Sequence, residues 1–221
     1  MNIMKYFYLI WAVAVFILVF VKDGPSVDTI THSAILIFFF GTLAVYYFQK
    51  NNVIKNPKFY FISRCIVSAA VVEGCYMISK PVLPSLQIIE GMSAGQMLQN
   101  YCIDLLFTVP AYVFIFYVIW WLINRYEYTF WEFAIVIAFG QALGDGGRTF
   151  LLHPALIFLV PYVMINYHAM NVVPYLNVRN VLPVGRIKSA WRYIMPIVLI
   201  PATYLVSGVF IYTIAAVLKL Q

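Results

Sequence analysis

The chain has 221 residues, of which 64% are hydrophobic and only 10% are charged, and its mean hydropathy is +0.89. Soluble domains carry about 25% charged residues, so this composition excludes a soluble domain and predicts a helical membrane protein. The formal net charge is +6. Because no basic face alternates with exposed aromatic residues, the charge indicates loops that meet anionic lipid headgroups, with no nucleic-acid partner.

Seven apolar segments approach the length of ~20 residues that crosses a bilayer. They predict an all-α bundle forming one integral-membrane domain over residues 1–221. The first segment resembles a signal peptide, but no small residues mark a cleavage position, so we expect it to be retained. The seven predicted spans cover about 4–21, 33–48, 61–78, 101–123, 130–146, 151–170 and 193–218.

The basic residues indicate how the spans are oriented. With seven spans, the side that holds the N-terminus carries ten lysines and arginines, and the other side carries Lys22, Lys80, Arg148 and Lys219. Cytoplasmic loops are enriched in these residues, so the sequence predicts a cytoplasmic N-terminus. The ten are Lys5, Lys50, Lys55, Lys58, Arg64, Arg125, Arg179, Arg186, Lys188 and Arg192.

Two carboxylates, Glu73 and Asp104, occur inside predicted spans. A charge at bilayer depth costs at least ~2.5–3.5 kcal/mol, so each is a candidate for a functional group facing the protein interior. On the fifth span, Gln141 and Asp145 are four residues apart and share a helix face. The predicted orientation places these four groups in one layer, in the outer half of the membrane.

Paired buried carboxyls have a specific chemistry. One of the pair can keep its proton at neutral pH and pass it to an apolar substrate. The alternative is that each acid only satisfies a helix end or a hydroxyl, and for Asp104, near a span end, the two interpretations are equally weighted. Gly140 and Gly144 favour close helix packing.

Other patterns exclude several classes of protein. The three cysteines, Cys65, Cys75 and Cys102, resemble small packing residues, with neither a metal-ligand spacing nor a disulfide framework. Lys219 lies too near the end of the last span for a retinal linkage, and three histidines are too few for a di-iron site. No metal or cofactor is predicted.

Four short motifs occur in order on successive spans. They are Val72-Glu73-Gly74, Asp104-Leu-x-Phe-x-x-Pro110, Gly140-Gln141-x-x-Gly144-Asp145, and His153-Pro154 followed by Asn166. Together they resemble the motifs of the EXPERA group, a family that contains the emopamil-binding protein, a sterol isomerase, and the sigma-2 receptor. The resemblance covers about 62–174 and implies an EXPERA-like helical core, with extra spans at about 4–21 and 193–218.

The resemblance implies an activity and a site. In the family's isomerase an acid protonates a sterol alkene, a carbocation forms, and a base removes a different proton. Glu73 and Asp104 are the implied catalytic carboxylates, which transfer protons and stabilise the cation. The implied substrate contacts come from the polar groups Gln141, Asp145 and Asn166, from the aromatic faces of Tyr76 and Phe107, and from Thr108.

One departure keeps alternatives open. The family's isomerase has a histidine one turn before its glutamate, and Ala69 occupies that position here. The first hypothesis is a double-bond isomerase acting on a sterol or related polycyclic terpenoid. The second is a non-enzymatic sterol- or lipid-binding protein, and the third is a membrane-bound terpene cyclase. The expected partners are an apolar lipid and the bilayer, with a homodimer left open. The membrane is that of the endoplasmic reticulum in a eukaryotic host, or the cytoplasmic membrane in a bacterium.

Overall fold

The computed structural model describes residues 2–49 and 54–219, so Lys50 of the predicted basic side lies outside the described residues. Within these ranges the chain is helical, and its only β-type pairing is the isolated bridge between Tyr126 and Ile187. The elements are α1 (Asn2–Asp23), α2 (Val27–Gln49), α3 (Pro57–Tyr76), η1 (Pro84–Leu86), α4 (Ala94–Arg125), α5 (Phe130–Leu152), η2 (Pro154–Leu159), α6 (Val160–Val178) and α7 (Trp191–Val217).

Several helices begin where the sequence supplies a cap. The Asn56 side chain accepts a hydrogen bond from the Phe59 backbone amide, and Pro57 occupies the first turn of α3, where its missing N–H is not needed. Ser93 with Gln96, and Thr129 with Glu132, form capping boxes at the starts of α4 and α5. These local signals fix where three of the helices begin.

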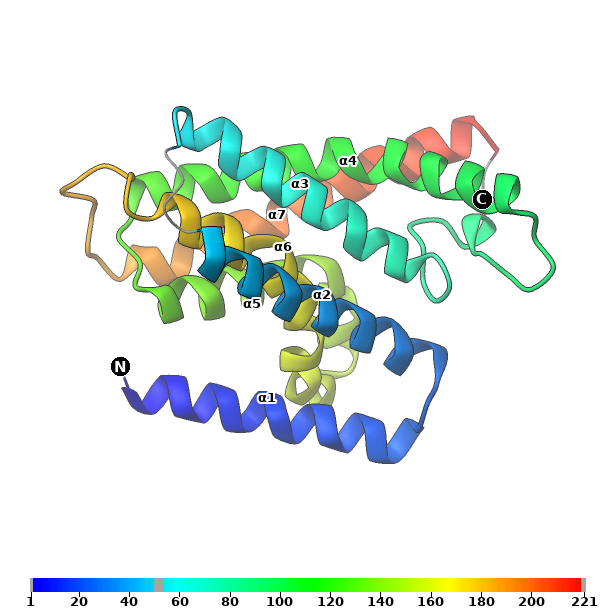
Figure 1. Ribbon diagram of the computed structural model, residues 1–221, viewed down its shortest axis with the longest axis horizontal. Coiled ribbons are helices and arrows are strands. Elements are labelled where there is room, and N and C mark those ends of the chain that lie inside the picture. The colour runs from blue at the N-terminus through cyan, green and yellow to red at the C-terminus, as the bar shows by residue number, and fades with distance from the viewer. Residues whose placement is uncertain (1, 50–53, 220–221) are drawn as a thin grey trace.

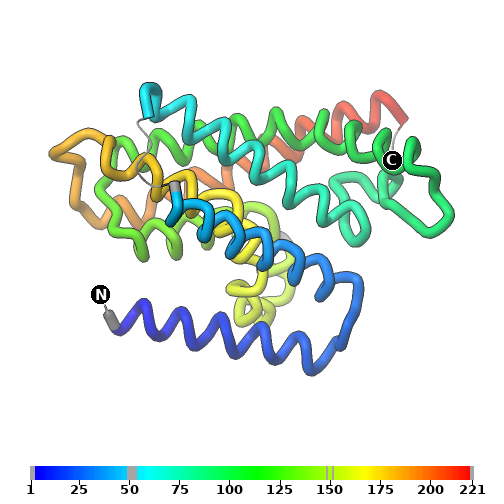
Figure 2. Tube along the Cα trace, viewed as in Figure 1, coloured from blue at the N-terminus to red at the C-terminus, as the bar shows by residue number. Residues whose placement is uncertain are grey.

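Helix α6 lies at the centre of the bundle and packs against α1, α2, α3 and α5 (Figure 1). Almost all of its side chains are buried. Helix α7 packs between α4 and α5, whereas α1 lies at the periphery and meets the bundle mainly through α6 (Figure 2). The span expected to be additional at the C-terminal end is therefore one wall of the bundle.

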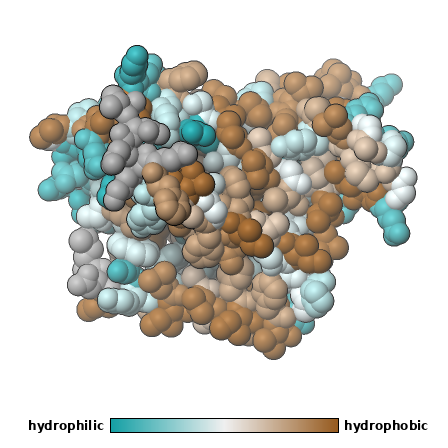
Figure 3. Space-filling view, viewed as in Figure 1, coloured by the Kyte–Doolittle hydropathy of each residue, from teal (hydrophilic) through white to brown (hydrophobic). Residues whose placement is uncertain are grey.

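Among the described residues, six helical segments are long and apolar enough to cross a membrane, as expected of an integral membrane protein. They comprise α1, α2, α3, α4, the η2–α6 segment and α7; helix α5, the predicted fifth span, is not among them. Apolar side chains cover much of the face in Figure 3, in keeping with contact with lipid. The all-α class and the membrane class are thus confirmed at this level.

Several predicted boundaries differ from the ends of the helices, including the start of α4 at 94 and not at 101. Helix α2 begins at 27 and not at 33, because hydroxyls such as that of Thr31 bond to backbone carbonyls one turn earlier and so fit inside the helix. Helix α5 continues past its glycines to 152, and α6 runs from 160 through Pro174 to 178. The residues from Pro154 to Leu159, predicted to open the sixth span, form the separate helix η2.

The glycines of α5 bring it close to α7. A Cβ atom at Gly140 would lie 2.8 Å from the Pro196 carbonyl oxygen, and one at Gly144 would lie 2.5 Å from the Tyr204 ring. Both distances are shorter than real contacts allow, so only glycine permits this approach. The two glycines thus place α5 and α7 side by side, as adjacent walls of one interior space.

Candidate functional site

The interior space is a cavity of about 1360 Å³ to which all seven α-helices contribute lining residues. Its walls are mostly apolar, including Val72, Ile115 and Leu159, and polar side chains enter at a few places. Ligand pockets of ~300–1,000 Å³ hold drug-sized molecules, so this volume accommodates a whole lipid-like molecule. A mostly apolar wall with a few converging polar groups is the usual form of a ligand site.

Glu73 enters the cavity from α3. Its carboxylate accepts a hydrogen bond from the Tyr112 hydroxyl of α4. The two residues lie on neighbouring, packed helices, so the bond fixes the carboxylate in one position at the cavity wall. Glu73 is itself only partly buried, which leaves part of its carboxylate open to the cavity.

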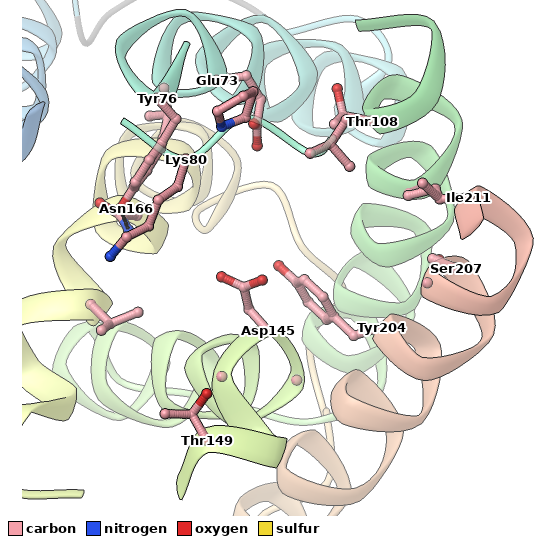
Figure 4. A pocket seen from close by; sticks show the side chains of 18 of the residues that line it. Glu73, Tyr76, Lys80, Thr108, Asp145, Thr149, Asn166, Tyr204, Ser207 and Ile211 are labelled. Atoms are coloured by element: carbon pink, nitrogen blue, oxygen red, sulfur yellow. Dashed lines mark hydrogen bonds between the residues drawn. The ribbon is translucent and has the colours of Figure 1, made fainter. Parts of the chain in front are cut away.

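Asp145 enters from α5, on the opposite wall. Figure 4 shows Glu73 and Asp145 pointing toward the same open space, with the Tyr204 hydroxyl beside Asp145. The Tyr167 hydroxyl of α6 donates to Asp145 Oδ2 over 2.7 Å. Two carboxylates from different helices therefore face one apolar cavity, and each is held by a tyrosine.

Gln141 supports this wall from behind. It is completely buried, its Nε2 donates to the Tyr204 hydroxyl over 3.4 Å, and its Oε1 accepts from Asn171. Gln141 is not among the lining residues, so it is placed to orient Tyr204 and does not face the cavity. Gln141 and Asp145 were predicted to share a helix face. Asp145 lines the cavity and Gln141 lies behind it, and each is hydrogen-bonded to a tyrosine.

A second polar cluster lies on another part of the wall. Asn166 Nδ2 donates to the Tyr76 hydroxyl over 2.6 Å, and the Tyr76 hydroxyl lies 3.1 Å from His32 Nε2. On its other side, His32 Nδ1 lies 2.9 Å from the Asp28 carbonyl oxygen and 3.5 Å from its carboxylate. Lys80 pairs with Asp28 over 3.3 Å and is largely exposed, so this cluster extends from the cavity to the protein surface.

The structure places the residues predicted from sequence in two groups. Glu73, Tyr76, Thr108, Asp145 and Asn166 line the cavity, and Gln141 lies directly behind it. Asp104 and Phe107 lie outside the set of lining residues. Phe107 packs in a small apolar cluster with Met77 and Leu83.

Asp104 is directed toward the chain between α3 and α4. Its Oδ1 accepts the Val82 backbone N–H over 2.9 Å, and its Oδ2 is buried without a hydrogen-bond partner among the described residues. The carboxylate holds the connection after α3 against α4. The carboxylate that faces the cavity opposite Glu73 is that of Asp145, and not that of Asp104.

The sequence interpretation missed the tyrosines and His32. Tyr112, Tyr167 and Tyr204 all line the cavity beside the two carboxylates. A tyrosine in an apolar span is usually a packing residue with a polar tip, so its type alone carries little signal. Tyr112 follows Asp104 by eight residues and so lies near the same face of α4, which was an available indication.

No family model, no curated protein and no solved structure matches the chain. The function must therefore be argued from the residues themselves. Within the described residues there is no group of three or more histidine, cysteine, aspartate and glutamate side chains placed to hold a metal ion. The fold and the site define a class, a polytopic helical membrane protein with a large, mostly apolar cavity whose acidic lining residues are Asp23, Asp28, Glu73 and Asp145.

Proposed function

We propose that the protein is an integral-membrane isomerase that moves a double bond in a sterol or a related polycyclic terpenoid by proton transfer. The observation that carries this proposal is the pair Glu73 and Asp145, which face one apolar cavity from opposite walls. The volume suits a rigid multi-ring lipid, and the helical walls suit a substrate that is dissolved in the membrane. Under the same proposal, residues 62–174 correspond to an EXPERA-like core.

The reaction needs one acid and one base. The protonated member of the pair gives its proton to one alkene carbon, and the alkene's electron pair forms the new C–H bond. The neighbouring carbon becomes a cation, which the ionised member stabilises. A base then removes a proton from the next carbon, and the electrons of that C–H bond form the shifted double bond. The reaction is redox-neutral.

The cavity also suits the cationic intermediate. Rings of Tyr76, Tyr112, Tyr167 and Tyr204 line it, and an aromatic face attracts a cation by ≈ 2 kcal/mol when water is excluded. Where a bound apolar lipid displaces water from these walls, each of these interactions becomes stronger. Among the described lining residues Lys80 is the one lysine or arginine, and it is already paired with Asp28.

Analysis of the lipids that co-purify with the protein tests the proposal. We expect wild-type protein to carry a polycyclic isoprenoid enriched in one double-bond isomer, and Glu73→Gln and Asp145→Asn to carry the other isomer. Glu90→Gln, an exposed acid in the α3–α4 connection, is the matched control and should behave as wild type. A bound lipid with the same isomer ratio in all four proteins contradicts the proposal.

One observation favours a second candidate, a lipid-binding protein without catalysis. Both carboxylates already accept hydroxyl hydrogen bonds, an arrangement that stabilises the ionised form and can pair with a cationic amphiphile. For this candidate, a lipophilic amine should bind wild-type protein and lose affinity in both carboxylate variants, while no isomer shift appears in the bound lipid.

A further inference from the structure

The cluster of Asp28, His32 and Tyr76 has the geometry of an activated hydroxyl. The Tyr76 oxygen lies 3.1 Å from His32 Nε2, within the distance at which a base takes a proton from a nucleophile or an acid. The other ring nitrogen of His32 lies 2.9 Å from the Asp28 carbonyl oxygen and 3.5 Å from the Asp28 carboxylate. The Tyr76 hydroxyl, the His32 imidazole and the Asp28 carboxylate therefore lie next to one another in this order.

The hydrogen bonds give this sequence a direction. Asn166 Nδ2 can only donate, so the Tyr76 oxygen accepts that bond and its own proton is free to point at His32. The Asp28 carbonyl can only accept, so His32 carries its proton on Nδ1 and leaves Nε2 as the acceptor. Each donor thus points from Asn166 toward Asp28.

The surroundings hold the imidazole in place. His32 is 4% exposed, and its ring stacks on Tyr162 of α6 at 3.9 Å between centroids. The Tyr162 hydroxyl also donates to Asp28 over 3.2 Å, and Lys80 pairs with the same carboxylate. Tyr76, in contrast, lines the cavity on the same helix as Glu73 and one turn away.

We propose that Tyr76, His32 and Asp28 form a triad that makes the Tyr76 hydroxyl a second acid–base centre of the cavity. Tyr76 is the catalytic member, and His32 and Asp28 are positioning residues that act through it. As Tyr76 takes a proton from the bound molecule, its own proton passes to His32 Nε2. The resulting imidazolium lies beside the Asp28 carboxylate, which stabilises it.

With the triad, the acid and the base of the isomerase reaction are different residues. This role of the triad rests on the proposed function. The carboxylate pair supplies the proton to the alkene, and Tyr76 removes a proton from the neighbouring C–H bond, whose electrons form the new double bond. His32 then returns the proton to water at the surface, near the half-exposed Asp28. The activation of Tyr76 itself does not depend on any isomerase activity.

A lipophilic arylsulfonyl fluoride, applied to the protein in lipid nanodiscs, tests the activation directly. The Tyr76 oxygen forms the new O–S bond, the S–F bond breaks, fluoride leaves, and the phenol proton goes to His32. Peptide mass spectrometry measures labelling at each tyrosine. Tyr212 lines the same cavity and is 57% exposed, so it is the internal control for a tyrosine that the reagent reaches freely. We expect Tyr76 to react much faster than Tyr212, and His32→Gln to lower Tyr76 labelling about 100-fold, as for loss of a general base.

The variants separate the triad from the carboxylate pair. His32→Gln keeps a hydrogen-bond acceptor beside Tyr76 but cannot take its proton, and an unchanged melting temperature shows that the fold is intact. Glu73→Gln should leave Tyr76 labelling as in wild type. Labelling of Tyr76 no faster than Tyr212, or an equal fall in Glu73→Gln and His32→Gln, overturns the triad. If the lipid isomer ratio is the same in wild type and the carboxylate variants while Tyr76 still reacts fast, the isomerase proposal is wrong and the triad is supported.

Discussion

At the scale of single residues, Glu73, Asp104 and Asp145 differ in the partner that each carboxylate has. Glu73 and Asp145 accept tyrosine hydroxyls and face the cavity, whereas Asp104 accepts a backbone N–H and faces a connecting segment. We therefore propose chemistry for the first two carboxylates and a local structural role for Asp104. The three acids are distinguished by their hydrogen-bond partners, and not by their predicted depth in the membrane.

Replacement of Asp104 tests this division. Asp104→Ala leaves the Val82 N–H without its acceptor and should lower the free energy of unfolding by about 1–3 kcal/mol. Asp104→Asn keeps an acceptor oxygen and should lose little stability and no lipid conversion. Thermal unfolding in detergent, with the bound-lipid analysis in parallel, measures both effects. Loss of conversion in Asp104→Asn at unchanged melting temperature would show that Asp104 has a catalytic role.

Sequence reasoning reaches part of the site at this scale. A carboxylate in an apolar span stands out from its surroundings, so Glu73 and Asp145 are identifiable from the sequence alone. The direction of a side chain near a span end depends on the following loop, and for that reason the sequence interpretation included Asp104 in the site. Tyrosine hydroxyls and His32 are indistinguishable by type from packing residues, so their contribution emerges only in the packed bundle.

At the scale of helices, the contact between α5 and α7 determines the shape of the cavity. Gly140 and Gly144 allow α7 to approach so closely that Tyr204 reaches the side of Asp145. The spacing of the two glycines predicts close packing but cannot name the partner helix. The last span lies outside the family-like core that the motifs predict, and its role as a wall follows only from its contacts.

Gly140→Ala tests this helix contact. The added Cβ would meet the Pro196 carbonyl at 2.8 Å, so the helices must separate, and we expect a loss of about 1–3 kcal/mol in the free energy of unfolding. Gly41→Ala, on α2 with nothing within 4 Å of the new Cβ, is the matched control. It should be neutral or gain about 0.5–1 kcal/mol from its helix preference. Equal stability of the two variants would contradict the close approach.

At the scale of the whole molecule, the helices alternate in direction around α6. In Figure 1 the start of α1 lies at the same end as the starts of α3, α5 and α7, and the C-terminus lies at the other end. Composition is sufficient for the helical membrane class, because repeated apolar runs of this length are typical of membrane-spanning helices. The central position of α6 cannot be read from composition, since lipid and protein interior select the same apolar residues.

The predicted orientation gives a direct test of this arrangement. Arg186→Cys, in the α6–α7 connection, and Glu90→Cys, in the α3–α4 connection, should react from opposite sides of sealed vesicles with a membrane-impermeant maleimide. Native Cys65, Cys75 and Cys102 are first replaced by serine or alanine. With a cytoplasmic N-terminus, Arg186→Cys reacts from the cytoplasmic side. Labelling of both positions from one side would contradict an alternating seven-helix path.

The central claim is that the carboxylates of the cavity exchange a proton with a carbon atom of a bound lipid. Incubation of the protein in D₂O, in nanodiscs that contain the co-purified lipid, tests it most directly. Mass spectrometry should find deuterium on carbon in lipid recovered from wild-type protein, and little in lipid from Glu73→Gln or Asp145→Asn. Lipid that binds to the wild type and returns without deuterium on carbon would contradict the isomerase and favour a binding protein.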